Sequence, residues 1–281
     1  MQCSHSLPDL CPGTTTLALC LATEGQLFQK DCGPNARPIF ADVLAKTTRC
    51  DPNFTLHFQW YIRGLARARE LGWVDFATFD IEDYERFDDP TLLNANQITP
   101  KMVAFIGPEE RSQGKQWSEY MHEPGEFVEE FKRRGISTVV RLNEPSTYDK
   151  EIFQSEGIEV VDLEFQDCTT PSPAVIKRFL DVVDGAKGVV AVHCMAGLGR
   201  TGTLIAIHMM KNHGFSGLEA MGLVRLMRPG SIIGPQQSFV ASMKHAVWDG
   251  NLVVSEINSP AIDLNLSRVM AAQIANAVRC L

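Results

Sequence analysis

One short segment of the chain combines the residue types needed to bind a phosphate group and to attack it. The segment reads His193-Cys194-Met195-Ala196-Gly197-Leu198-Gly199-Arg200-Thr201-Gly202. It follows an apolar stretch with strand character, residues 188–192, and leads into an apolar stretch with helical character, residues 201–211. The first backbone N–H groups of a helix have no intrahelical acceptor, so they converge on an anion. The spacing therefore predicts a phosphate-binding loop that holds a nucleophile.

Each polar side chain of this segment has an expected role. Cys194 is the predicted nucleophile, because loop dipoles, a helix N-terminus and a guanidinium all favour the thiolate form of a cysteine. Arg200 can hold two phosphoryl oxygens with its planar guanidinium, and Thr201 can donate its hydroxyl toward the sulfur. His193 either orders the loop by hydrogen bonding or is an ordinary buried histidine. The predicted phosphate-binding residues are Met195, Ala196, Gly197, Leu198, Gly199, Arg200 and Thr201.

The alternative for the whole segment is a glycine-rich turn with an inert, buried cysteine. The flanking strand and helix agree with the phosphate loop, and such a match in context is much more specific than a lone glycine motif. The segment resembles the signature His-Cys-(x)5-Arg-Thr/Ser of cysteine-dependent protein phosphatases. More closely, it is similar to the cell-division-cycle fourteen type of dual-specificity phosphatase. Residues 76–85, 139–143, 193–206 and 228–237 carry this resemblance, within a region from about 37 to 250.

The resemblance implies an enzyme of the cell cycle that acts at mitotic exit. Such an enzyme would hydrolyse phosphoserine and phosphothreonine at proline-directed sites, and phosphotyrosine, through a cysteinyl-phosphate. The residues leave two other functions open. A silent phosphoprotein-binding module would fit a shortened partner domain, and a phosphoinositide phosphatase would call for more basic residues around the loop. Met195 and Leu198 are uncharged, which argues against the phosphoinositide substrate.

A second chemical group must protonate the departing oxygen of a poor leaving group. Asp167 follows the apolar stretch 158–165 and precedes Pro171-Ser172-Pro173. The residues alone leave a general acid and an ordinary loop aspartate equally open. The resembling family has its general acid in an Asp-x-x-Thr-Pro-Ser context, which implies that role for Asp167. Ser172 is the predicted N-cap of a helix that begins near Pro173.

Turnover also requires a water molecule that attacks the cysteinyl-phosphate, with Asp167 as the base. Gln236 is the candidate that positions this water, because an amide can donate and accept at once. Gln237 is the second candidate. A polar helix start explains both glutamines equally simply, and only the resemblance favours the catalytic role.

Composition limits the classes of protein to consider. The chain has 281 residues and 44% hydrophobic content, enough to bury one large or two modest domains. The formal net charge of -8 argues against broad nucleic-acid or anionic-membrane binding and favours neutral to basic phosphoprotein partners. No stretch approaches the roughly 20 apolar residues of a membrane span. The short apolar stretch 17–22 has no preceding Lys or Arg, so a secretory signal is not expected.

The eight cysteines do not form a Cys-x-x-Cys pair. No metal and no cofactor are therefore expected. A catalytic thiolate needs a reducing compartment, so we expect the protein in the nucleus and cytoplasm.

Apolar and helical patterns alternate from residue 100 to residue 248. Expected strands cover 100–107, 136–142, 158–165 and 188–192, and expected helices cover 119–134, 146–156, 173–183, 201–213, 216–227 and 236–248. This alternation predicts an α/β fold with a parallel-rich sheet flanked by helices, as in protein tyrosine phosphatases. The site is then expected at the carboxyl ends of the strands.

The pattern before residue 100 is different. Residues 54–72 predict an amphipathic helix, and residues 75–89 hold seven acidic residues against a single arginine. A solvated charged face would explain this acidity in a generic protein. The resembling family has two tandem phosphatase-like domains, with an acidic groove for a basic residue beyond phosphoserine-proline. Glu85 aligns with a glutamate of that groove, and Glu82 and Asp88 are expected to add to its field.

Four regions are expected along the chain. They are a divergent or poorly ordered N-terminus (1–36), a truncated helical remnant of the N-terminal phosphatase-like domain with the acidic linker (37–97), the catalytic domain (98–250) and a C-terminal extension (251–281). A homodimer built on the remnant is one arrangement that such a division allows. Met195 stands where the resembling family often has a basic residue, which removes a positive charge from the loop.

Overall fold

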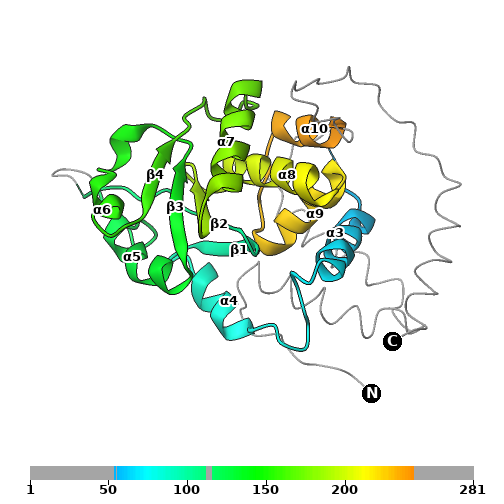
Figure 1. Ribbon diagram of the computed structural model, residues 1–281, viewed down its shortest axis with the longest axis horizontal. Helices are drawn as coiled ribbons and strands as arrows, with labels where there is room; N and C mark the ends of the chain where they lie inside the picture. Colours follow the sequence, from blue (N-terminus) through cyan, green and yellow to red (C-terminus); the bar gives the residue numbers. More distant parts are fainter. Residues whose placement is uncertain (1–53, 55, 112–115, 244–281) are drawn as a thin grey trace, which may run out of the picture.

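A five-stranded sheet forms the centre of the computed structural model, which describes residues 54, 56–111 and 116–243 (Figure 1). Its strands are β1 (Ala95–Thr99), β2 (Met102–Phe105), β3 (Ile136–Arg141), β4 (Glu159–Asp162) and β5 (Val189–His193), in the order β1-β2-β5-β3-β4. β1 is antiparallel to β2, and the other neighbours are parallel. The carboxyl ends of β2, β3, β4 and β5 therefore lie at one edge, which confirms the predicted α/β fold with a parallel-rich sheet.

Helices cover both faces of the sheet. They are α3 (Phe58–Glu70), α4 (Ile81–Asp88), α5 (Pro124–Arg133), the 3-10 turn Pro145–Thr147, α6 (Glu151–Gln154), α7 (Pro173–Gly185), α8 (Gly199–His213), α9 (Gly217–Met227) and α10 (Pro235–Ser242). Among the described residues, none of these helices has the length and apolar character of a membrane span.

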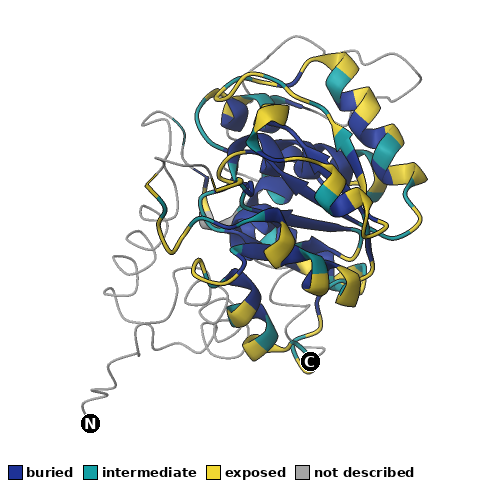
Figure 2. Cartoon of the chain, turned by 90° about the vertical axis from the view of Figure 1, so that its left-hand side faces the viewer, coloured by how far each residue is buried: buried dark blue, intermediate teal, exposed yellow. Residues whose placement is uncertain are grey.

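Strand alternation divides the buried side chains into two cores. Met102 and Ala104 of β2 pack in the core beneath α3, α7, α8, α9 and α10, whereas Val103 and Phe105 pack in the core beneath α5 and α6. Successive residues of a strand point to opposite faces, so a fully apolar strand such as β2 can bury both. Figure 2 shows the result, with buried residues in the sheet and on the inner faces of the helices.

The elements before residue 98 belong to these same two cores. β1 crosses the expected boundary between residues 97 and 98 and pairs with β2. α3 packs closely on α9: a Cβ on Gly64 would lie 2.3 Å from the Glu219 carbonyl oxygen, and one on Gly222 would lie 2.4 Å from that of Trp60. The helix expected over 54–72 is present as α3, and the acidic stretch contains α4. The described part of 37–97 thus adds a strand to the sheet and helices to the layers that pack on it.

Several expected boundaries were wrong for local reasons. α5 begins at Pro124 and not at residue 119, because Glu123 and Glu126 cap its first turn reciprocally and Pro124 fits the first helical position. The helix expected over 146–156 is reduced to a 3-10 turn and the four residues of α6. α8 begins two residues early, at Gly199.

Other local expectations were confirmed, and some cannot be compared with the structure. Ser172 caps α7 as predicted, since its side chain accepts the Val175 N–H. The helix expected over 236–248 is α10, which ends at Ser242 with Met243 as its C-cap. Residues 244–248 and the expected regions 1–36 and 251–281 lie outside the described residues.

Candidate active site

The predicted nucleophile loop, residues 194–198, joins the central strand β5 to the largely buried helix α8. β5 ends at His193 and α8 begins at Gly199, so residues 194–198 join them at the carboxyl edge of the sheet. Cys194 is 3% exposed and Arg200 is 2% exposed. Arg200 Nη1 donates to the carbonyl oxygens of Leu142 at 3.0 Å and Phe165 at 2.9 Å, which follow β3 and β4. The ends of three strands thus converge on the cysteine and the arginine.

The carbonyl groups of the loop are all bound from outside it. The donors to the carbonyl oxygens of residues 194 to 198 are, in order, His193 Nδ1, the Gly107 N–H, Arg228 Nη2, Arg228 Nε and the Gly202 N–H. The N–H and C=O groups of a trans peptide unit point in opposite directions. Because these carbonyls face outward, the amides that follow them, residues 195–199, turn toward the inside of the loop. This is the arrangement that binds an anion.

Gly197 permits the tight curl of this loop. Its φ is +67°, and a Cβ there would lie 1.9 Å from the Phe105 carbonyl oxygen at the end of β2. Any other residue would have to displace that strand end.

Arg228 fixes the loop, and sequence reasoning did not identify this role. Its guanidinium holds the carbonyls of Ala196 and Gly197 and also donates to Asn96 Oδ1 at 2.6 Å. Burial lowers the pKa of Arg228 below its ordinary value, although the charge of Asp88 opposes this. The Asn96 amide in turn donates to Asp88 at 2.8 Å. Asp88 is therefore an interior partner of this cluster and 8% exposed, which corrects the expectation that it adds to an open acidic groove.

His193 is buried between the loop and Tyr148. Its Nδ1 lies 3.0 Å from the Cys194 carbonyl oxygen and its Nε2 lies 2.9 Å from the Tyr148 hydroxyl. A carbonyl only accepts, so Nδ1 carries the hydrogen and Nε2 accepts from the tyrosine. Burial lowers the pKa of His193 to about 3 and raises that of Tyr148. Both groups are therefore neutral at pH 7, and they hold the loop carbonyl in place.

Thr201 does not form the expected hydrogen bond to the sulfur. Its hydroxyl is buried and has no hydrogen-bond partner in the part of the chain that the structure describes. α8 begins at Gly199, so Thr201 lies within the first helical turn and not ahead of it.

The loop that carries Asp167 closes over the arginine. Asp167 Oδ1 lies 3.1 Å from Arg200 Nε, and its side chain is 61% exposed. This contact is an ion pair without hydrogen-bond geometry, since Arg200 Nε makes no hydrogen bond to the described residues. Asp167 can therefore reach an oxygen atom above the loop without first breaking a directed bond.

Gln236 connects the Asp167 loop to the start of α10. It is fully buried, its Nε2 donates to the Thr169 carbonyl oxygen at 2.9 Å, and its Oε1 accepts the Ile233 N–H at 3.4 Å. A Cβ on Gly199 would lie 2.8 Å from the same Oε1. The amide thus lies against the start of α8 and also anchors the loop that carries Asp167. Gln237 is equally buried.

Among the described residues, no hydrogen bond or ion pair links Glu85 to the Cys194 loop, Asp167 or Gln236. Glu85 is half-buried on α4. Residues two apart on a helix differ by about 200°, so it faces away from Asp83. Asp83 binds Arg86, Arg133 and Arg134. Burial raises the pKa of Asp83, but its hydrogen bonds from these arginines lower it overall, to about 2.

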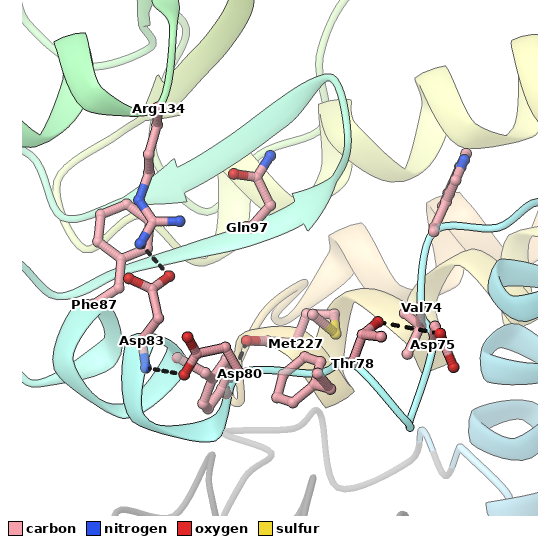
Figure 3. A pocket seen from close by; sticks show the side chains of 12 residues that line it. Val74, Asp75, Thr78, Asp80, Asp83, Phe87, Gln97, Arg134 and Met227 are labelled. Atoms are coloured by element: carbon pink, nitrogen blue, oxygen red, sulfur yellow. Dashed lines mark hydrogen bonds and ion pairs between the residues drawn. The ribbon is translucent and has the colours of Figure 1, made fainter.

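A separate cavity lies beside α4 and is distinct from the nucleophile loop. It is lined by aromatic, acidic and other side chains that include Trp73, Asp80, Asp83, Gln97 and Arg134. Figure 3 shows Arg134 bound to Asp83 along one wall and the Thr78–Asp75 hydrogen bond along another. Its carboxylates are thus engaged with neighbouring groups.

Comparisons with known proteins find similarity to protein phosphatases. Residues 122–240 match the family model described as a Swiss Army Knife protein, DSP-PTPase phosphatase domain. The chain is 43% identical over 198 residues to the tyrosine-protein phosphatase cdc-14 of Caenorhabditis elegans. The matched residues make up 70% of this chain and 28% of that relative. It is 37% identical over 213 residues to the dual specificity protein phosphatase CDC14A of Homo sapiens, and here the matched residues make up 75% of this chain and 36% of that relative.

A solved structure is also similar in part. Tk-PTP in its active form is 27% identical, with a TM-score of 0.42, over 52% of this chain and 92% of that chain. The chain spans about a third of the length of the two curated relatives. Over that part, it carries a dual-specificity protein tyrosine phosphatase domain that is homologous to the CDC14 phosphatases.

Proposed function

We propose that this chain is a metal-independent dual-specificity protein phosphatase that acts through a cysteinyl-phosphate. The observation that carries the proposal is the loop around Cys194, whose carbonyls are all held outward while Arg200 lies in the first turn of α8. Such a loop stabilises the negative charge of a phosphoryl group and of its transition state with dipoles fixed before the reaction.

The proposed reaction has two steps. The Cys194 thiolate attacks phosphorus, the bond to the substrate oxygen breaks, and Asp167 gives its proton to that oxygen. Water then attacks the cysteinyl-phosphate, Asp167 takes a proton from it, and phosphate leaves with the thiolate restored. Arg200 and the loop amides hold the phosphoryl oxygens in both steps. Gln236 assists the second step by positioning the water and the Asp167 loop.

The proposed substrates are phosphoserine and phosphothreonine before proline, and phosphotyrosine. A basic residue further along the substrate would be attracted by Glu85. This preference, and a role in the cell cycle within the nucleus and cytoplasm, rest on the resemblance to the CDC14 phosphatases.

The test is phosphate release, without added metal, from a phosphoserine-proline-x-lysine peptide and from p-nitrophenyl phosphate. Acid quenching during turnover should trap one phosphoryl group on the peptide that contains Cys194. Turnover without any phosphorylated Cys194 would overturn the mechanism. Binding of the peptide without turnover would instead favour a silent phosphoprotein-binding module.

Replacing Asp167 by asparagine should remove the proton donor and leave the nucleophile intact. We expect kcat/KM to fall by about 10² to 10⁴ for the phosphoserine peptide, whose leaving group is poor, and far less for p-nitrophenyl phosphate. Asp181→Asn on the exposed part of α7 is the matched control and should change neither value. An equal loss on both substrates would show that Asp167 is not the general acid.

Replacing Glu85 by lysine should reverse the charge that attracts a basic substrate residue. We expect kcat/KM for the lysine-containing peptide to fall about fivefold to tenfold at low salt, because an attraction is lost and a repulsion replaces it. Hydrolysis of p-nitrophenyl phosphate should not change. Glu129→Lys, the same charge change on the exposed side of α5, is the control. Equal losses in the two variants would assign the effect to net charge alone.

A further inference from the structure

Exposed apolar side chains gather at the carboxyl edge of the sheet. Among the described residues, the large hydrophobic side chains that are exposed are Ile81 (46%), Leu92 (48%), Tyr120 (51%) and Met195 (41%). Single exposed apolar residues are normal on a protein surface. Their positions matter more, because Leu92, Tyr120 and Met195 come from three separate segments that hydrogen bonds link to one another at this edge.

Hydrogen bonds join the Met195 and Tyr120 segments. The Met195 carbonyl oxygen accepts the Gly107 N–H at 2.8 Å. Two residues further on, the Glu109 N–H donates to the His122 carbonyl oxygen at 2.9 Å, next to the turn that contains Tyr120. The segment after β2 therefore lies between the nucleophile loop and the Tyr120 turn.

The turn that contains Leu92 is hydrogen-bonded to the same segments at this edge of the sheet. His122 Nε2 donates to the Pro90 carbonyl oxygen at 3.0 Å. The Asn94 carbonyl oxygen accepts the Ile106 N–H at 3.1 Å, and the Asn94 side chain accepts from Arg228, which holds the nucleophile loop. Leu92 lies between these two anchored residues. We name Met195, Leu92 and Tyr120 the apolar rim.

Ile81 lies elsewhere and serves as a natural comparison. It begins α4, and two residues later Asp83 binds Arg134, which lies two residues before the start of β3. Ile81 is thus associated with the amino edge of the parallel strands, at the opposite end from the nucleophile loop.

Met195 follows the nucleophile directly, and its position is fixed by its backbone. Cys194 is buried while the Met195 side chain is exposed, so a peptide whose phosphate enters the loop meets the thioether first. Methionine is flexible and adapts to apolar side chains of different shapes. A substrate residue packed there would cover apolar surface that is otherwise in water.

We propose that the apolar rim binds a large apolar side chain of the phosphoprotein substrate, close to the phosphorylated residue. This inference rests on the proposed phosphatase function, because the phosphate in the loop brings the peptide to the rim. The rim is continuous with the site that binds the phosphate, and Met195 contributes its backbone to one and its side chain to the other.

The test compares phosphoserine peptides that differ only by leucine or glutamine at one position, within two residues of the phosphoserine. At one position, leucine should raise kcat/KM about tenfold over glutamine, the scale expected when much of an aliphatic side chain leaves water. Met195→Gln, Leu92→Gln and Tyr120→Gln should each bring this ratio toward one. Met195→Leu should keep it, as should the matched control Ile81→Gln.

Each ratio is taken within one variant, so a change in overall catalysis cancels. Equal rates for leucine and glutamine at every position, in a wild-type chain that hydrolyses p-nitrophenyl phosphate, would overturn the rim and leave the phosphatase function intact. So would an Ile81→Gln effect as large as those of the rim variants. If the wild-type chain hydrolyses nothing, the phosphatase function fails, and calorimetric binding of the same peptide pairs decides the rim separately.

Discussion

Replacing Cys194 by serine should abolish phosphate release from both peptides and p-nitrophenyl phosphate. The serine hydroxyl fits the space of the thiol but stays protonated, so the loop dipoles have no anion to stabilise as a nucleophile. Removing a single nucleophile lowers kcat by about a million-fold in well-studied enzymes, which places this variant below detection in an ordinary assay. Continuous phosphate release and single-turnover trapping both measure this loss.

The control for this variant is Cys168→Ser. Cys168 is exposed, whereas Cys194 is buried, and we expect the control to hydrolyse the substrates at nearly the parental rate. The Cys194→Ser chain should still bind phosphopeptide, because Arg200 and the loop amides are unchanged. Turnover in Cys194→Ser comparable to the parent would show that another group is the nucleophile and would overturn the proposed chemistry.

Replacing Arg200 by lysine should be the next most damaging change. The guanidinium holds the Leu142 and Phe165 carbonyls through Nη1, so its remaining N–H groups are fixed in direction. A lysine has a single ammonium without this planar fork. We expect kcat/KM to fall about 10³-fold on every substrate, near the upper end for loss of one preorganised donor.

The Leu142 and Phe165 carbonyls also lose a partner in Arg200→Lys, so stability must be measured beside activity. Thermal unfolding of the variant gives the fraction folded at the assay temperature. Binding of orthovanadate, which resembles the phosphoryl transition state, should weaken in parallel with kcat/KM. A folded variant with parental orthovanadate affinity would contradict the assigned role of Arg200.

The strand, loop and helix around Cys194 were predictable because their signal is local. Cys194, Arg200 and the glycines lie within seven residues, and the apolar strand and helix on either side are obvious from sequence. Asp167 and Gln236 needed the family resemblance, since an aspartate in a loop and a glutamine at a helix start have ordinary explanations. The structure places Asp167 Oδ1 3.1 Å from Arg200 Nε, and Gln236 donates to the Thr169 carbonyl in the Asp167 loop at 2.9 Å.

The missed features depend on contacts between distant residues. Arg228 acts on Gly197, 31 residues away, and no local pattern marks it as part of the loop. β1 contains the polar residues Asn96 and Gln97, which hide its strand character, although Asn96 uses its side chain to bind Arg228 and Asp88. A sequence pattern shows which face of an element is apolar, but it does not show which polar side chain a distant arginine will bind.

Because the carbonyls of residues 194–198 are held outward in the folded protein, this loop is ordered before any substrate binds. In water, a phosphate dianion is surrounded by molecules that must reorient as charge moves during the reaction. In the proposed reaction the loop amides replace these water molecules, and the orientation of the loop is set by Arg228, His193 and Gly107 when the protein folds. The entropy of that ordering is lost once per folding event and not once per catalytic cycle.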